Sequence, residues 1–134
     1  MKQEIPIFFA VDDGYIPFLA VALQSLSENI NKEKIYTIKI LYTSINENNK
    51  NEIKKYENDN IKIEFVNVQE TLKKLKDNLL IRDYYSNATY YRALIPNLYP
   101  KYDKVLYLDA DIIILDDVAK LYNKNIDNYL IAGV

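Results

Sequence analysis

Two carboxylates, Asp109 and Asp111, follow directly on the short apolar run Val-Leu-Tyr-Leu at residues 105–108. In an extended chain residues i and i+2 point to the same side, so we expect both carboxylates together at the C-terminal end of a buried strand. Carboxylates held side by side repel each other, and a hard divalent cation such as Mn²⁺ or Mg²⁺ relieves that repulsion because it prefers oxygen ligands. Open α/β sheets bind ligands beyond the carboxyl ends of their strands. The pair therefore predicts a metal site able to hold a diphosphate, the alternative being a strand-end turn with solvated carboxylates.

A second polar cluster, Asp12-Asp13-Gly14-Tyr15, ends the apolar run at residues 5–11. An aspartate here could accept a hydrogen bond from a base, and Gly14 would let the backbone approach a ligand closely. Tyr15 offers an aromatic face on which a base could stack. The alternative is that an aspartate simply caps the following helix, which needs no ligand.

Arg92 lies among the apolar and aromatic residues Tyr90, Tyr91, Leu94 and Ile95. Such surroundings predict a partly buried guanidinium, which needs an anion as its partner. A phosphate or one of the aspartates would serve. The alternative is an ordinary ion pair on an exposed surface.

The elements that must position these residues alternate along the chain between strands and helices. Continuous or alternating apolar runs predict strands, and apolar residues at a helical spacing predict helices. The predicted strands are 5–11, 35–42, 61–68, 105–108 and 129–134. The predicted helices are 15 to about 29, 46–56, 70–80, 88–95 and a helical turn at 116–122. Strands and helices in this order indicate an α/β fold with a mostly parallel sheet and right-handed crossovers.

Length and composition narrow the classes of function. The chain has 134 residues, enough for one domain with a real core, and a net charge of −2, which gives no general attraction to nucleic acid. It contains neither cysteine nor histidine, which excludes a disulfide, a thiolate or imidazole ligand and a Ser-His nucleophile within this chain. No apolar run approaches the length of a membrane span. We expect a cytoplasmic protein.

Three stretches together resemble glycosyltransferase family 8, which holds glycogenin and the bacterial lipopolysaccharide glucosyl- and galactosyltransferases. They read Ile-Phe-Phe-Ala-Val-Asp-Asp-Gly-Tyr at 7–15, Tyr-Tyr-Arg-Ala at 90–93 and Lys-Val-Leu-Tyr-Leu-Asp-Ala-Asp at 104–111. The resemblance implies a GT-A-type, Rossmann-like fold and retaining transfer of a hexose from a UDP-sugar, UDP-glucose or UDP-galactose. The implied acceptor is a lipopolysaccharide, a glycan or a glycoprotein, and the implied cofactor is Mn²⁺ or Mg²⁺.

The resemblance also implies roles for individual residues. Ala10 and Asp12 would hold the uracil, and Tyr15 would stack on it. Asp109 and Asp111 would bind the metal, with Ala110 making backbone contacts near the ribose.

Arg92 would contact the donor sugar or the diphosphate, so the resemblance makes Arg92 and Asp109 the residues expected to act in the reaction. Position 14 departs from the family, because it is Gly where many members carry Asn or another polar residue.

The resemblance also implies that residues 1–134 form a single GT-A nucleotide-sugar-binding domain that lacks the acceptor half. Family domains are about twice as long, and their later half supplies a metal-ligating histidine. This leaves two alternatives to catalysis by the chain itself. One is a non-catalytic half-domain that needs a partner chain and self-associates through an exposed strand at 129–134. The other is an Asp-x-Asp phosphatase built on residues 105–113.

Overall fold

The computed structural model describes residues 1–78 and 88–133. Its centre is a sheet of four strands in the order β3 (Ile61–Asn67), β2 (Lys34–Tyr42), β1 (Gln3–Ala10) and β4 (Leu106–Tyr107). All three strand pairs are parallel. The predicted α/β fold with a parallel sheet is confirmed.

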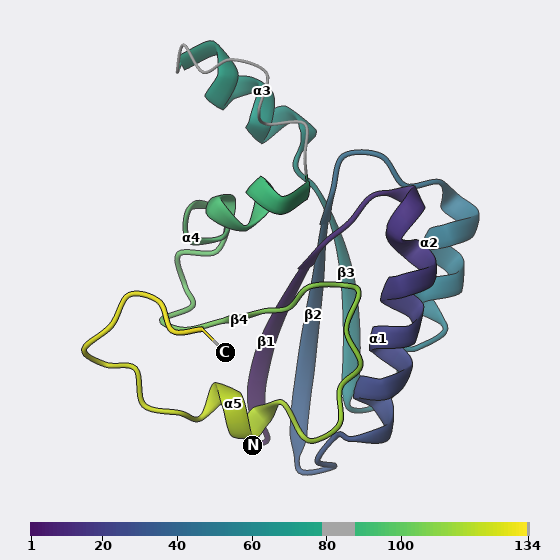
Figure 1. Ribbon diagram of the computed structural model, residues 1–134, viewed down its shortest axis with the longest axis vertical. Coiled ribbons are helices and arrows are strands. Elements are labelled where there is room, and N and C mark those ends of the chain that lie inside the picture. The colour runs from purple at the N-terminus through teal and green to yellow at the C-terminus, as the bar shows by residue number, and fades with distance from the viewer. Residues whose placement is uncertain (79–87, 134) are drawn as a thin grey trace.

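One face of the sheet is covered by α1 (Ile16–Glu28) and α2 (Glu47–Lys54), as Figure 1 shows. Alternate residues of β1 point toward these helices, and Ile5, Ile7 and Phe9 are fully buried there. A short 3-10 turn, η1 (Asp13–Tyr15), connects β1 to α1. This face carries the larger of the two apolar clusters, which fixes where β1 ends relative to α1.

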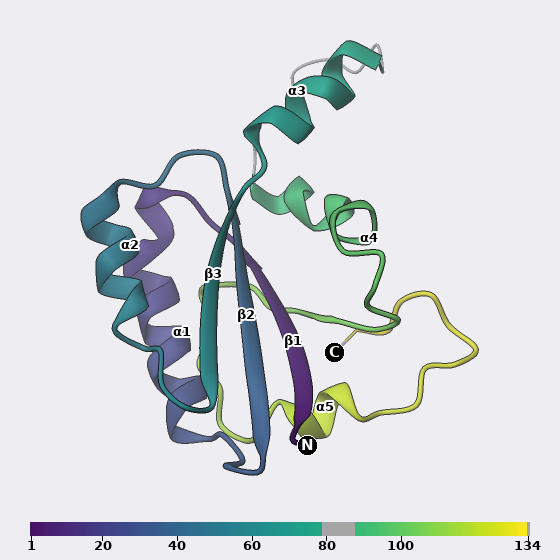
Figure 2. The ribbon, with the colours of Figure 1, turned by 180° about the vertical axis from the view of Figure 1, so that it is seen from behind.

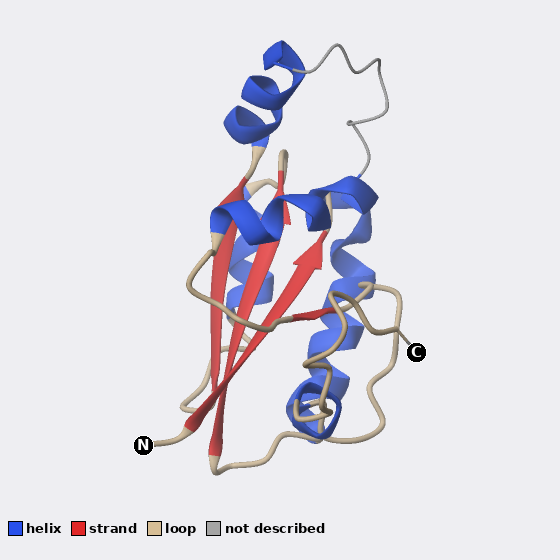
Figure 3. Cartoon of the chain, turned by 90° about the vertical axis from the view of Figure 1, so that its left-hand side faces the viewer, coloured by secondary structure: helices blue, strands red, loops and turns tan. Residues whose placement is uncertain are grey.

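The opposite face is covered by the 3-10 helix η3 (Ala88–Leu94) and by α4 (Ile95–Leu98), which lie across the sheet in Figure 3. Phe8, on the other side of β1 from Phe9, packs here with Tyr91 and Leu94. α3 (Gln69–Asn78) extends away from the end of β3, as both Figure 1 and Figure 2 show. The last two residues of the predicted helix 70–80 lie outside the described part of the chain.

Beyond β4 the chain departs from the sequence-based predictions in two places. β4 holds only two residues, because the chain bends at Ala110 and runs down beside α1 to α5 (Ala119–Tyr122). The predicted strand at 129–134 is wrong for its described part, since residues 129–133 form no strand and follow a loop that leaves the sheet. Its apolar sequence was suited to a strand, but the described residues of this segment pair with none of the four strands of the sheet. Among the described residues, no helix is both long and apolar enough to cross a membrane.

Candidate functional site

The candidate site lies where the strand order of the sheet reverses. From β1 the chain adds β2 and then β3 on one side, whereas β4 is added on the other side of β1. Open parallel sheets bind ligands at such a reversal, beyond the carboxyl ends of the two strands that flank it. Asp12 comes two residues after β1, and Asp109 comes two residues after β4. The fold thus brings the two predicted clusters to the same edge of the sheet, on adjacent strands.

The carboxylate pair is held outward by the residue between its members. The Ala110 side chain is 6% exposed and belongs to the core cluster beneath α1, whereas Asp109 and Asp111 are both exposed. Just upstream, the Leu108 N–H donates to the carbonyl of Phe8 at 3.0 Å, which keeps the chain beside β1 up to the first carboxylate. Burial of the central residue therefore turns both carboxylates toward solvent.

These two carboxylates fit a hard divalent cation that takes its remaining ligands from elsewhere. Neither makes a hydrogen bond or ion pair with any described residue. The described residues gather no cluster of three or more metal-binding acidic, histidine or cysteine side chains. Two oxygen ligands from a protein suit Mg²⁺ or Mn²⁺, which commonly complete their shell with water and phosphate oxygens. The chain could hold such an ion jointly with a diphosphate.

Arg92 is exposed, so the expectation that it would be partly buried is wrong. In the 3-10 geometry of η3, residues three apart share a face, and Tyr91 and Leu94 form the buried one. The Arg92 guanidinium instead lies over the ring of Tyr107, 5.7 Å from its centroid. Burial raises the pKa of Tyr107, the charge of Asp109 raises it further and that of Arg92 lowers it. Arg92 and Asp109 thus act on one ring, and the fold brings these two predicted residues to the same place.

Asp12 caps the turn that follows β1, as in the alternative that requires no ligand. Its Oδ1 accepts a hydrogen bond from the Gly14 N–H at 3.0 Å. A Cβ at position 14 would lie 3.3 Å from that same oxygen, which is a tight contact. Tyr15 follows with 49% of its surface exposed, its ring tilted against that of Phe18 at 5.7 Å. Ala10, the last residue of β1, is partly buried.

Asp13 has a positioning role that the sequence did not reveal. Its Oδ1 accepts from the backbone N–H of Asn46 at 3.0 Å and from the side-chain amides of Asn46 and Asn49 at 3.1 and 2.9 Å. These bonds, that from Asn49 first, lower the pKa of Asp13. They tie the turn after β1 to the first turn of α2. The only signal in the sequence was a pair of asparagines at a predicted helix start, with nothing to indicate their partner.

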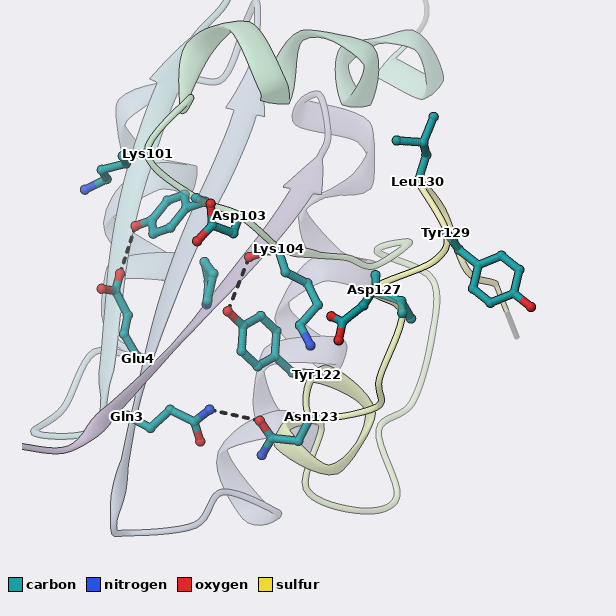
Figure 4. A pocket seen from close by; sticks show the side chains of 13 residues that line it. Gln3, Glu4, Lys101, Asp103, Lys104, Tyr122, Asn123, Asp127, Tyr129 and Leu130 are labelled. Atoms are coloured by element: carbon teal, nitrogen blue, oxygen red, sulfur yellow. Dashed lines mark hydrogen bonds between the residues drawn. The ribbon is translucent and has the colours of Figure 1, made fainter.

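A large pocket lies at the opposite edge of the sheet and is not the candidate site. It has a volume of about 770 Å³ and is lined by the start of β1, by residues 101–104 and by residues 122–130 (Figure 4). Its polar side chains are largely paired with each other, as in the bonds from Gln3 to Asn123 at 2.9 Å and from Tyr102 to Glu4 at 2.8 Å. Lys104 is the lining residue that comes nearest to Asp109 in the sequence, five residues before it. At roughly 3.3 Å per residue, an extended chain of that length spans about 16 Å, so the pocket is separate from the carboxylate pair.

Comparison with known proteins identifies the family of the chain. The model of the family described as Glycosyl transferase family 8 matches residues 6–134. General stress protein A of Bacillus subtilis (strain 168) is 29% identical over 140 residues, and the match covers 99% of this chain. The chain spans less than half of the curated relatives that it matches, 47% of that protein and 39% of a Haemophilus influenzae relative.

Two solved glycosyltransferases share the fold. The galactosyltransferase LgtC, in complex with donor and acceptor sugar analogues, has a TM-score of 0.65 and 25% identity, over 90% of this chain and 43% of its own. The bifunctional glycosyltransferase WbbM, without ligand, has a TM-score of 0.81 and 24% identity, over 93% of this chain and 22% of its own. The four-stranded parallel sheet flanked by helices is thus the GT-A type that the sequence predicted.

Proposed function

The chain belongs to glycosyltransferase family 8, and from this we propose that it binds UDP-glucose or UDP-galactose for transfer of the hexose to a glycan acceptor. The proposal rests above all on one observation. Two exposed carboxylates, unpaired with any described residue, lie beyond β4 at the reversal of the strand order, next to the turn that follows β1. Family membership leaves the phosphatase hypothesis for residues 105–113 without support.

In this proposal different residues around the carboxylate pair bind different parts of the donor. Asp109 and Asp111 would hold Mn²⁺ or Mg²⁺, which when bound would offset the negative charge that builds up on the departing diphosphate. Arg92, held over Tyr107 beside that pair, is placed to contact a phosphate or the donor sugar.

The turn after β1 would receive the nucleoside. The exposed ring of Tyr15 offers a stacking surface for uracil, and the free carboxylate oxygen of Asp12 offers an acceptor for a base N–H. Ala10 and Ala110 carry no polar side chain, so their part in the proposal is through backbone groups. Held in this way, the donor would be oriented for attack by an acceptor rather than activated covalently.

Calorimetric titration of UDP into the chain, with and without Mn²⁺, tests the proposal. We expect binding that depends on Mn²⁺, and we expect Asp109→Asn and Asp111→Asn each to abolish that dependence while the circular dichroism spectrum stays unchanged. Asp127→Asn, at the remote pocket, is the matched control and should bind as the parent does. A folded parent chain that fails to bind UDP, or asparagine variants that keep the metal dependence, would refute the assignment.

A second candidate function is a half-domain that works only with a partner. Tyr129, Leu130 and Ile131 are 71%, 102% and 86% exposed, an unusual density of apolar surface for a short segment. The predicted exposed apolar surface is thus present, although it is not a strand. We propose that the chain self-associates through this segment. Sedimentation velocity should show a concentration-dependent dimer that Leu130→Ser and Ile131→Ser together abolish, and an unchanged distribution would exclude it.

A further inference from the structure

The segment that carries the carboxylate pair leaves the sheet and runs down beside α1 (Figure 1). The side chains of Ser25, in α1, and of Asn29, the C-cap of α1, bind both backbone polar groups of one residue of this segment, Ile114. The Ile114 N–H donates to Ser25 Oγ at 2.9 Å, and the Asn29 Nδ2 donates to the Ile114 carbonyl at 3.0 Å. A strand neighbour normally provides such a pair of bonds, and here a helix provides it instead.

Both side chains also make a hydrogen bond within α1. Ser25 is 9% exposed, and its hydroxyl also donates to the carbonyl of Ala22 at 2.8 Å. Asn29, the residue that ends α1, uses its other amide hydrogen on the carbonyl of Ser25 at 2.9 Å. A serine within the buried stripe of a helix loses its water on folding, so its hydrogen bonds must come from the protein. Water therefore cannot replace the hydrogen bond between Ser25 and the downstream segment.

The apolar sequence of this segment leaves its register open. Residues 112–115 read Ile-Ile-Ile-Leu, so either set of alternate side chains could pack against α1 with similar burial. In the structure the Ile114 side chain is only 7% exposed, whereas Ile113 and Leu115 are 67% and 84% exposed. A slip of one residue would exchange the two faces at little apolar cost. It would also turn Asp111 away from its present exposed position.

We infer that Ser25 and Asn29 are positioning residues, which fix the register of residues 112–115 and thereby the direction of the Asp109–Asp111 pair. This inference rests on the proposed function, because the pair matters only if it binds a metal. Leu108, bonded to Phe8, holds the loop at its upstream end, and Ile114 holds it downstream. Groups that hydrogen-bond directly to metal ligands commonly contribute roughly 10- to 100-fold to metal affinity, and we expect an effect of that order to be transmitted here through Ile114.

The test compares Ser25→Ala with Ser27→Ala. Ser27 makes the same kind of bond within α1, from its hydroxyl to the Gln24 carbonyl at 2.7 Å, and has no bond to the downstream segment. We expect Ser25→Ala to weaken Mn²⁺ binding in the presence of UDP by roughly 10- to 100-fold, with Ser27→Ala unchanged. Ser25→Thr, which keeps the hydroxyl, should restore most of the affinity. Asn29→Ala, at the end of the helix, supplies a second variant if Ser25→Ala does not fold.

Two readouts separate this inference from the proposed function. Hydrogen exchange should show loss of protection at the Ile114 amide in Ser25→Ala, independently of any ligand. Parent chain that binds no UDP with Mn²⁺ refutes the proposed function, and with it the role assigned to the pair. Parent chain that binds, together with folded Ser25→Ala and Asn29→Ala that bind Mn²⁺ equally well, refutes the inference alone. Lower stability of these variants with unchanged metal affinity would mean a merely structural role, which also overturns it.

Discussion

One buried phenol, that of Tyr36 in β2, joins three distant parts of the chain. Its hydroxyl accepts from the Asn31 N–H at 2.9 Å and donates to Asp117 Oδ1 at 2.6 Å. The same Asp117 oxygen accepts from the Ala119 N–H at 2.9 Å, at the start of α5. The ring itself is fully buried. Tyr36→Phe therefore removes only the hydroxyl, in a place where the side chain cannot move away.

The size of the effect follows from the two bonds. A hydrogen bond to a charged group contributes about 1.5 to 3 kcal/mol, and one to a neutral backbone group about 0.5 to 1.5 kcal/mol. Because Asn31 is exposed, water can replace part of the second bond. We therefore expect Tyr36→Phe to lower the free energy of unfolding by about 2 to 4 kcal/mol. Single domains unfold at about 5 to 15 kcal/mol, so the variant should still fold.

Urea unfolding followed by circular dichroism measures this loss. At a slope of roughly 2 kcal/mol per molar urea, the midpoint should fall by about 1 to 2 M. A double-mutant cycle with Asp117→Ala should give a coupling of about 1.5 to 3 kcal/mol, because the lost cap at Ala119 cancels between the two backgrounds. Tyr56→Phe is the control, since the Tyr56 hydroxyl has no hydrogen bond with a described residue. A coupling below about 0.5 kcal/mol would refute the reasoning.

Two further predictions concern other parts of the fold. Burial, and the hydrogen bond to Glu4, raise the pKa of Tyr102 to about 12, above its ordinary value of 10.0. The contribution of the neutral Tyr102 phenol to stability is therefore complete below pH 10 and lost as the pH rises toward 12. Over that pH range the urea midpoint of Tyr102→Phe should fall less than that of the parent chain. An identical fall in the two proteins would contradict this. Asn46 caps α2 by accepting from the N–H three residues later at 2.9 Å, so Asn46→Ala should cost about 1 kcal/mol in urea unfolding, whereas Asn48→Ala, exposed in the same turn, should cost little.

Several features of the fold were determined by the local sequence. The three long strands and the helices α1 and α2 came out within two residues of the predicted bounds at every end. The Asp109–Asp111 pair was found in the same way, because a carboxylate after an apolar run is a local signal. Periodicity and strand-end chemistry depend on neighbours in the sequence, so the sequence was enough for them.

Only the tertiary structure decided which parts of the chain meet. The described part of the predicted strand 129–134 pairs with no strand of the sheet, and Arg92 turns outward because η3 buries Tyr91 instead. The bonds of Asn29 to Ile114 and of Tyr36 to Asp117 join residues 85 and 81 positions apart. Such partners depend on the strand order and on how the helices pack, and no local pattern contains either. The sequence thus determined which polar residues follow the strands, and the packing of the segment after β4 against α1 decided that Asp109 and Asp111 point to solvent.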